Sequence, residues 1–445
     1  MLIRGSARLL FLAPAAYPFG GVADWLDYLL PGLSALRWEC TLGLVDGRYH
    51  DVDAYLSRHP WEQVVRIKNP TGSREGRIQA LMATIARTRP DILAVVNIVD
   101  AYAAVRRLRL SGKPSPRLVA TLHGLQSDLL SDLRDEADVI EAVVSPNRLA
   151  VKLAGQAIGA DARALYAPCG VSLSDDADSI EHQSRGALRL LYSGRLEQEQ
   201  KRILDLPEIL EALRGHGIET HLALAGGGPD EATLRSKFES MGLLNQVSFL
   251  GVLNPHDLAQ EYRRHDALVI TSVWETGPIV AWEAMSHGLP VLTSRYVGSG
   301  LEAALVDGVN SLLFPVGDIQ AAARAAMKLT QPGIHARLVQ GALDLLQQRY
   351  SRAVSVAQWH DAFNQIRDLP LLPSPSLRPP HSPSGRLDRW LGAAMGQHAR
   401  RVLGLSYQHH EPGGEWPHTT HAHEGQIDFL LRAAALDKSG LQAAS

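Results

Sequence analysis

Residues 267–294 read ALVITSVWETGPIVAWEAMSHGLPVLTS and begin and end in short apolar runs. The runs at 267–271 and 290–293 are mostly apolar, which is typical of parallel strands covered by helices on both faces. Between them, Gly277 and Pro278 favour the start of a helix, because proline is well tolerated in the first helical turn. The stretch therefore predicts a β-strand, an α-helix and a second, parallel β-strand.

The same alternation of apolar runs and longer helical stretches extends over most of the chain. Helical periodicity is clear at 74–88 and 146–158. The predicted strands lie at 8–13, 40–45, 63–67, 91–96, 117–122 and 139–144, and again at 187–192, 220–225, 246–250, 267–271, 290–293 and 311–314. Two successive groups of this kind predict an α/β fold with two doubly wound, Rossmann-like domains.

Composition shifts suggest where these domains end. We expect the N-terminal domain at 1–170 and the second domain at 186–349, because the segment 168–187 lacks clear periodicity. Residues 369–385, LPLLPSPSLRPPHSPSG, are rich in proline and predict an extended linker. Residues 386–445 then form a partly helical tail.

The composition is that of a soluble globular protein, with 45% hydrophobic residues among 445. A formal net charge of −3 argues against nucleic acid as a bulk partner. Cys40 and Cys169 provide neither a disulfide framework nor a four-ligand zinc site, so we expect a reduced, cytoplasmic setting. No apolar run approaches the roughly 20 residues of a membrane-spanning helix, and the short run at 9–13 is better explained as a buried strand than as a signal peptide.

Two positively charged residues follow the predicted strand at 187–192. Arg195 and Lys201 lie in SGRLEQEQK, residues 193–201. At the carboxyl end of a strand in a doubly wound sheet, such a pair can bind a diphosphate and stabilise it as it leaves. The alternative is an arginine and a lysine on a solvated loop. Because the chain has only seven lysines, a functional role is somewhat favoured for Lys201.

Two glutamates follow the strand at 267–271. Glu275 lies in the loop, and Glu283 lies eight residues later, inside the predicted helix. Apolar residues flank Glu283, so its carboxylate needs donors, either ribose hydroxyls or a neighbouring backbone group or arginine. A helix that begins at Pro278 also leaves backbone amides of its first turn available to a ligand.

Three further turns follow predicted strands. Gly20 and Gly21 precede a helix and either let its amides approach an anion or form a plain tight turn. AGGGPD at 225–230 is either a nucleotide-binding turn or a simple strand-to-helix turn, and it lacks the spacing of a dinucleotide fingerprint. His123, before Gly124, is either a site residue or a structural histidine.

Together these segments resemble the retaining glycosyltransferases of family 4, which have the GT-B fold of two Rossmann-like domains facing a central cleft. The resemblance covers roughly residues 7–366. The matching segments are FGGV (19–22), HG (123–124), SGRLEQEQK (193–201), AGGGPD (225–230), FLG (249–251) and ETGPIVAWEAMSHGLPVLTS (275–294). Many members read Glu-Gly-Phe-Pro where this chain has Glu275-Thr276-Gly277-Pro278, which puts the contacts to the donor sugar in question.

The resemblance implies a role for each matching residue. Arg195 and Lys201 would hold the donor diphosphate, Glu283 the ribose hydroxyls, and His123 would lie near the reacting sugar. The implied catalytic residues are His123, Arg195, Lys201 and Glu275. The implied donor-binding residues are Gly20, Gly21, Arg195, Lys201, Gly227, Leu250, Glu275, Gly277, Pro278, Ile279 and Glu283. A helix at 350–368 would cross back to the N-terminal domain.

The implied activity is transfer of a sugar from a nucleotide-sugar donor to a glycan, lipid-linked or other hydroxyl acceptor. The anomeric configuration would be retained, with no obligatory metal and no cofactor. Two alternatives stay open, a nucleotide-sugar epimerase of the same fold and a non-catalytic nucleotide-sugar-binding subunit.

Other polar clusters are better explained without a metal. The pairs Asp51/Asp53 and Asp176/Asp178 have the Asp-x-Asp form of metal-binding glycosyltransferases, in which such a pair should end a strand beside the donor. Here the first pair opens a helix-like stretch and the second lies in the expected linker between the domains, so solvated charges explain them better. Three histidines of the tail are expected to bind no metal: His418, His421 and His423.

Residues 386–405 predict an amphipathic helix. Leu387, Trp390, Leu391, Ala394, Val402 and Leu405 fall near one face, with Arg386, Arg389, Arg400 and Arg401 as a basic complement. This pattern suits a helix on an anionic membrane surface, and a location that is cytoplasmic and peripheral to the membrane. A helix docked on the protein's own body or on a partner is the alternative.

Overall fold

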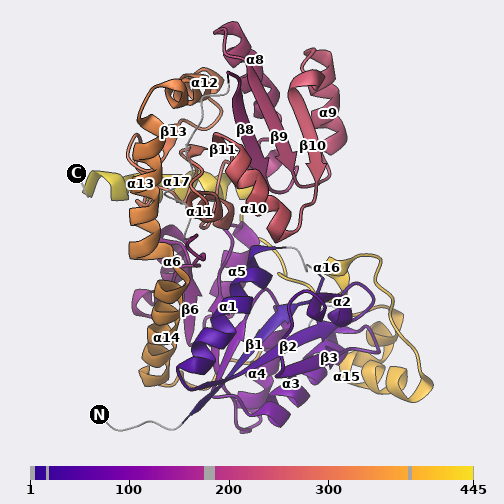
Figure 1. Cartoon of the computed structure of the whole chain (residues 1–445). Coiled ribbons are helices and arrows are strands. Elements are labelled where there is room, and N and C mark those ends of the chain that lie inside the picture. Colours follow the sequence, from indigo (N-terminus) through magenta and orange to yellow (C-terminus); the bar gives the residue numbers. More distant parts are fainter. Residues whose placement is uncertain (1–5, 17–19, 175–185, 379–382, 444–445) are drawn as a thin grey trace. The chain divides into compact units, whose positions relative to one another are not determined.

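The computed structural model describes residues 6–16, 20–174, 186–378 and 383–443 (Figure 1). The chain forms two compact units. Unit 1 comprises Met1–Ala167 and Val356–Phe429, and unit 2 comprises Pro168–Ser355 and Leu430–Ser445. Each unit has its own parallel sheet, so the prediction of two Rossmann-like α/β domains is confirmed.

Unit 1 contains a seven-stranded sheet in the order β3-β2-β1-β4-β5-β6-β7, and its strand pairs are parallel. The strands are β1 Ala7–Pro14, β2 Trp38–Asp46, β3 Val64–Lys68, β4 Ile92–Val95, β5 Arg117–Thr121, β6 Ala142–Ser145 and β7 Ala164–Tyr166. The helices between them are α1 Gly21–Ala35, α2 Val52–Leu56, α3 Arg74–Thr88, α4 Asp100–Leu110, α5 Ser127–Asp135 and α6 Arg148–Ile158.

Unit 2 contains a six-stranded parallel sheet in the order β10-β9-β8-β11-β12-β13. The strands are β8 Leu188–Ser193, β9 Thr220–Ala225, β10 Val247–Gly251, β11 Ala267–Ile270, β12 Val291–Ser294 and β13 Leu312–Phe314. The helices are α7 Gln198–Lys201, α8 Asp205–Gly215, α9 Glu231–Ser240, α10 Pro255–Arg264, α11 Ile279–Ser286, α12 Ile319–Met327 and α13 Ile334–Leu345.

The sheet of unit 2 is covered on both faces. Successive residues of a strand point to opposite faces. Leu190 of β8 packs in one apolar cluster, which also contains Leu222. The next residue, Leu191, packs in a second cluster, which also contains Leu268. All four residues of β11 are buried. This double burial explains why the strands read as continuous apolar runs.

Side-chain caps fix the ends of several helices. The Ser73 hydroxyl accepts a hydrogen bond from the Gly76 amide at the start of α3. Asn147 caps α6 in the same way, and that helix ends at Gly159, whose positive φ of 65° suits glycine. These local signals explain why the helices predicted at 74–88 and 146–158 agree with α3 and α6.

Helix α14, Arg352–Asp368, is part of unit 1 from Val356 onward. Its Trp359 ring lies 4.7 Å from that of Trp25 in α1, measured between centroids, and Phe363 lies 5.8 Å from Phe11 in β1. These side chains are fully buried. The aromatic cluster therefore makes the end of α14 part of the core of unit 1.

The residues that follow α14 are fastened to unit 1 by polar contacts. Residues 370–378 form neither helix nor strand. Within this stretch, the Ser376 backbone N–H donates a hydrogen bond to the Asp138 carboxylate at 2.9 Å. The helices of this extension are α15 Arg386–Leu403, α16 Pro412–Glu415 and α17 Gln426–Ala443. From Leu430 on, α17 is part of unit 2.

The predicted strands agree with the observed ones to within three residues at each end. The exception is β7, an edge strand of three residues that was not predicted. The join expected at 168–187 lies partly outside the described residues, and the pair Asp176/Asp178 lies wholly outside them. Among the helices that the structure describes, none combines the length and the apolar character needed to cross a membrane.

Candidate functional site

The candidate site of unit 2 lies where the strand order of its sheet reverses. Strands β8 and β11 are neighbours there, and their connections lead away to opposite sides. In doubly wound sheets, ligands bind outside the carboxyl ends of the two strands at such a point. Residues 194–201 follow β8, and residues 271–279 follow β11. The topology therefore brings the two loops that were predicted to carry the site to one edge of the sheet.

Lys201 and Glu275 meet at this edge. The Lys201 ammonium lies 2.6 Å from Glu275 Oε1, and the Ser272 hydroxyl donates to the same oxygen at 2.6 Å. Glu275 is only 7% exposed. A carboxylate so deeply buried needs such partners, since an unpaired buried charge is costly. The structure thus joins the predicted lysine and the first predicted glutamate in one ion pair.

Backbone contacts hold the two loops together. The Thr271 hydroxyl donates to the Lys201 carbonyl at 2.6 Å, and the Val273 amide donates to the Gln200 carbonyl at 2.8 Å. The Gln200 side chain donates to the Trp274 carbonyl at 3.0 Å. The ion pair is therefore part of a fixed junction between the loops. Ser272 and Gln200 were not predicted, because nothing in their sequence context distinguishes them from other loop residues.

Arg195 lies in the same loop as Lys201 but has a different environment. Its side chain is 61% exposed and contacts Glu197 at 3.2 Å. The Tyr192 hydroxyl donates to the Arg195 carbonyl at 2.7 Å, so the backbone of Arg195 is held while its guanidinium extends into solvent. An arginine with this exposure can rotate towards an anionic ligand.

The backbone at the start of α11 was predicted to contact the donor. Gly277 has a φ of 105°, which favours glycine, and Pro278 precedes the first helical residue, Ile279. Pro278 has no N–H and cannot donate to a ligand, so a donor role for its amide is excluded. The amides that remain for this role are those of Gly277, Ile279 and Val280.

Glu283 lies one turn inside α11 and is half-buried. The Tyr262 hydroxyl, from α10, donates to Glu283 Oε2 at 3.1 Å. Burial, together with the Glu283 carboxylate, raises the pKa of Tyr262 well above its usual value, so the phenol stays a donor. Tyr262 was missed from the sequence, since no motif links it to the helix that follows. The sequence predicted that Glu283 needs a donor, but it suggested ribose hydroxyls, a backbone group or an arginine and not this tyrosine.

The glycine-rich turn and the end of β10 lie beside these loops. The Leu196 amide donates to the Gly227 carbonyl at 3.0 Å, and a Cβ added to Gly228 would lie 2.2 Å from the Leu196 carbonyl oxygen. The turn is therefore packed against the loop that carries Arg195, which requires glycine for close approach. Leu250 is partly buried against the core.

Asp437, in α17, holds another loop of unit 2. Its buried carboxylate accepts hydrogen bonds from the amides of Gly298, Gly300 and Leu301, at 2.7, 3.0 and 2.7 Å. The residue before this loop, Val297, accepts a hydrogen bond from the Glu275 amide at 3.1 Å. The last helix thus supports the loop on which Glu275 rests.

The remaining predicted residues belong to unit 1. Gly20 caps α1 with extended backbone, Gly21 is the first helical residue, and a Cβ added to Gly20 would meet no atom within 4 Å. His123 follows β5 and lies in the aromatic cluster, 4.6 Å from the Trp25 ring and 6.4 Å from the Trp359 ring between centroids. Desolvation by burial lowers its pKa to about 4. His123 is therefore neutral at pH 7.

The low pKa of His123, a half-buried residue, predicts an acid-sensitive contribution to stability. Its pKa is about 4 when folded and 6.5 when unfolded, so protonation favours the unfolded chain. The folded state should keep this contribution above pH 6.5 and lose about 3 kcal/mol of it as the pH falls to about 4. Urea unfolding at pH 7 and pH 4.5 should therefore show a smaller loss for His123→Phe than for the unmodified protein.

The comparison with His123→Phe is needed because Asp132, also in unit 1, changes the stability with pH in the opposite direction. Burial raises the pKa of Asp132 to about 6, so its contribution to stability rises as the pH falls. The two proteins share this effect, and their difference isolates His123. An identical pH dependence in both would contradict the assignment.

The polar clusters considered as metal sites have other roles in the structure. Asp51 caps α2 through the Ala54 amide, and Asp53 forms an exposed ion pair with Arg66. His421 and His423 lie 3.7 and 3.0 Å from the carboxylate of Asp135 on the surface of unit 1. Three such groups are close enough to hold a metal. The expectation that the tail binds none stays a prediction.

Comparison with known proteins relates most of unit 2 to known glycosyl transferases. Residues 176–340 match the sequence model of the glycosyl transferases group 1. This segment contains Arg195, Lys201, Glu275 and Glu283, so the residues at the edge of the sheet all lie within the family's domain. The narrower assignment to family 4 stays a prediction.

Glycogen synthase of Mycobacterium tuberculosis is 28% identical over 230 residues, 52% of this chain and 53% of the relative. Lipopolysaccharide 1,6-galactosyltransferase of Salmonella typhimurium is 26% identical over 238 residues, 53% of this chain and 64% of the relative. The chain thus spans about half the length of the first of these relatives.

Solved structures show the same fold. The Alr3699/HepE protein of Anabaena, in complex with UDP and glucose, superimposes with a TM-score of 0.65 at 20% identity, over 81% of this chain and 100% of that one. This likeness, at 20% identity, shows the shared fold. The sequence similarity to the group 1 glycosyl transferases extends over residues 176–340.

Proposed function

We propose that this chain is a retaining, metal-independent glycosyltransferase, which moves a sugar from a nucleotide-sugar donor to a hydroxyl group of a glycan or lipid-linked acceptor. The observation that carries the proposal is the Lys201–Glu275 ion pair at the carboxyl edge of the sheet of unit 2. This edge is where doubly wound sheets bind their ligands. The similarity of residues 176–340 to the group 1 glycosyl transferases supports the same assignment.

Lys201 and Arg195 are proposed to bind the donor diphosphate. An ammonium group offers three N–H donors, so Lys201 can hold Glu275 and phosphate oxygens at the same time. Arg195 is exposed and can supply a second, bidentate contact. Negative charge on the diphosphate grows as it leaves, so these cations stabilise the transition state more than the bound substrate. In this proposal the two side chains supply the charge that a metal would otherwise provide.

The rest of the donor is assigned to the start and first turns of α11. A carboxylate can accept about four hydrogen bonds, so Glu283 can accept from ribose hydroxyls as well as from Tyr262. Glu275 and the amides of Gly277 and Ile279 are proposed to contact the sugar and a phosphate. The fixed junction between the loops supports this role, because a preorganised site needs little rearrangement when the donor binds.

The proposed reaction is attack on the same face from which the nucleotide leaves. A bond forms between the acceptor oxygen and the anomeric carbon while the bond from that carbon to the diphosphate oxygen breaks. The acceptor proton passes to the departing phosphate, so no covalent enzyme intermediate is required. His123, neutral at pH 7, is proposed to contact the sugar as a hydrogen-bonding partner and not as a cation.

A thermal-shift panel of nucleotide-sugars tests donor binding, since a ligand that binds the folded state raises the melting temperature. The donor that gives the largest shift is then incubated with and without acceptors. Release of the nucleotide with a new glycosidic bond of retained configuration supports the proposal. An altered free nucleotide-sugar without acceptor would indicate an epimerase, and binding without turnover would indicate a sensor subunit. No shift with any nucleotide-sugar would contradict the site itself.

The assignment of Glu283 predicts a loss of donor affinity. Glu283→Gln keeps the size of the side chain but removes its charge, and we expect the Kd for the donor to rise roughly tenfold to a hundredfold, as for a lost hydrogen bond to a charged group. Isothermal titration measures this change. Glu208→Gln in α8, which alters a carboxylate paired with Lys237, is the matched control and should bind the donor normally. Equal donor affinity in both variants would remove Glu283 from the site.

A further inference from the structure

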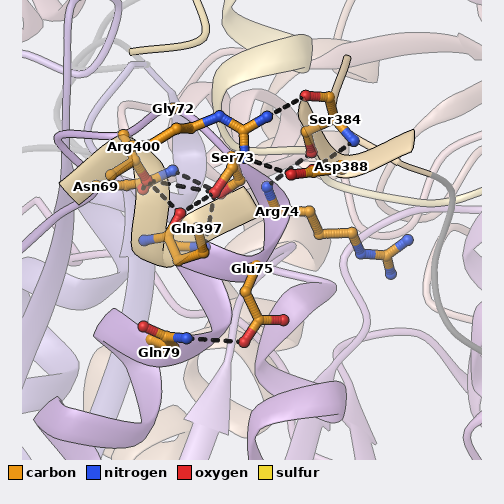
Figure 2. Close-up of polar contacts among 12 residues, drawn as sticks. Asn69, Gly72, Ser73, Arg74, Glu75, Gln79, Ser384, Asp388, Gln397 and Arg400 are labelled. Atoms are coloured by element: carbon orange, nitrogen blue, oxygen red, sulfur yellow. Dashed lines mark hydrogen bonds and ion pairs between the residues drawn. The ribbon is translucent and has the colours of Figure 1, made fainter. Parts of the chain in front are cut away.

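Helix α15 is attached to unit 1 through polar side chains (Figure 2). The Gln397 side-chain oxygen accepts hydrogen bonds from Thr71 and Ser73, at 2.9 and 2.5 Å, at the start of α3. Arg400 and Asp388 form an ion pair whose side chains are 4% and 2% exposed. The face of α15 that points into the protein is therefore its polar face.

A kink at Gly392, with a non-helical φ of 76° and ψ of 161°, divides α15 into two segments. The attachment fixes the rotation of both, since Asp388 lies in the first segment and Arg400 in the second. Ser384 donates its amide to Asp388 at 2.8 Å and accepts from Arg400 at 2.6 Å, and its hydroxyl accepts from the Arg74 amide at 3.1 Å. A Cβ added to Gly396 would lie 2.3 Å from the Asp388 carboxylate. Turning the helix would leave a buried charge without its partner, which is strongly unfavourable.

The apolar side chains of α15 consequently point away from the protein. Exposed fractions are 86% for Trp390, 60% for Met395, 69% for Val402 and 64% for Leu403, and Leu391 is about half exposed. Helices of soluble proteins usually pack with the opposite orientation, apolar face inward. An exposed group of large apolar side chains marks a surface that contacts a partner or a membrane.

The charges on the exposed side of α15 are all positive. Arg386, Arg389 and Arg401 are exposed, whereas the only acidic residue of the helix, Asp388, is buried against Arg400. Because Arg400 is paired with Asp388, it does not belong to the exposed basic residues that the sequence suggested. The exposed side chains of α15 therefore carry a charge of +3 from three arginines and include no carboxylate. Apolar side chains next to arginines, including a tryptophan, suit the interface of an anionic bilayer.

We propose that the outward face of α15, formed by Trp390, Leu391, Met395, Val402 and Leu403 and bordered by the three exposed arginines, binds the surface of an anionic lipid bilayer. Both segments of α15 would lie at the interface, with their polar side chains still fixed to unit 1. A second copy of this chain is a poorer occupant, because pairing two such faces would bring like charges together. The proposal does not depend on the proposed function.

Sedimentation of the full chain with lipid vesicles tests the proposal. One set of vesicles is phosphatidylcholine alone, and in the other a third of the lipid is phosphatidylglycerol. We expect binding to the anionic vesicles only, with weaker binding at high salt. Trp390→Ser combined with Val402→Ser should reduce the partition coefficient at least about tenfold, and Arg389→Gln about fivefold.

Matched controls separate this face from the rest of the surface. Val306→Ser with Val309→Ser removes two exposed apolar side chains from unit 2, and Lys113→Gln removes one exposed positive charge from unit 1. Both control proteins should bind like the unmodified protein. Melting temperatures should match throughout, because the altered side chains are exposed.

A spectroscopic measurement locates the contact. Lipids brominated on their acyl chains should quench part of the tryptophan fluorescence, and Trp390→Phe should abolish this quenching. Of the other seven tryptophans, Trp61 is half-buried, and Trp25, Trp38, Trp274, Trp282, Trp359 and Trp416 are buried. Equal vesicle binding by the unmodified protein and the Trp390/Val402 variant would overturn the proposal, and so would no binding by either. Concentration-dependent association without lipid that is lost in that variant would assign the face to a second copy.

Discussion

Replacing Lys201 with methionine should lower kcat about a hundredfold to a thousandfold, the loss typical of removing one donor to a developing negative charge. The ammonium group that contacts Glu275 at 2.6 Å lies at the edge of the sheet where the leaving diphosphate is proposed to bind. Its contribution grows as the diphosphate departs, so kcat should fall more than donor affinity. Initial rates with the donor found by thermal shift measure the effect.

Two variants separate chemistry from folding. Lys201→Met leaves the Glu275 carboxylate buried with the Ser272 hydroxyl, so its melting temperature will also fall. Lys201→Arg retains the charge and should recover the melting temperature and part of the activity. Lys237→Met breaks an ion pair with Glu208 in the same unit, away from the site, and should retain full kcat. If Lys201→Met and Lys237→Met have equal kcat values, the assignment of Lys201 is wrong.

Arg400→Leu should detach α15 from unit 1. The substitution leaves the Asp388 carboxylate buried without its arginine, and breaking a buried ion pair in this way costs about 3–5 kcal/mol. The cost falls on one helix, so we expect local opening instead of global unfolding. Hydrogen exchange of α15 and the rate of proteolysis within it measure the change, and both should increase strongly.

The neighbouring residue provides the control. Arg401→Leu removes the same side chain from an exposed position and should leave the exchange of α15 unchanged. Replacing Asp388 and Arg400 together with leucine should restore much of the protection, since an apolar pair leaves no buried charge unpaired. Equal exchange in Arg400→Leu and Arg401→Leu would show that the ion pair does not hold the helix.

The strands and the paired loops of unit 2 could be predicted because their signals are local. Runs such as 267–270, ALVI, are apolar throughout, and Arg195, Lys201 and Glu275 each follow a strand. The reversal of strand order between β8 and β11 then brings the loops together. Strand β7 has three residues, too few for periodicity to appear.

Contacts between distant residues could not be predicted. Tyr262 is 21 residues before Glu283, and Ser73 is 324 residues before Gln397. The orientation of α15 is the clearest example. Amphipathic periodicity predicts which side chains share a face, but the inward face is decided by Asp388, Gln397 and Arg400, whose partners lie elsewhere in the chain.

The hydrogen bonds of Asp437 have a practical consequence for how this protein can be shortened. A fragment that ends with the family domain, near residue 340, contains Lys201 and Glu275 but lacks the carboxylate that accepts from Gly298, Gly300 and Leu301. Three amides facing the same point form a nest that attracts anions. Phosphate or sulfate in the buffer of such a fragment would therefore occupy the position of Asp437, next to the loop that supports Glu275. Donor affinities measured on it would depend on the choice of buffer.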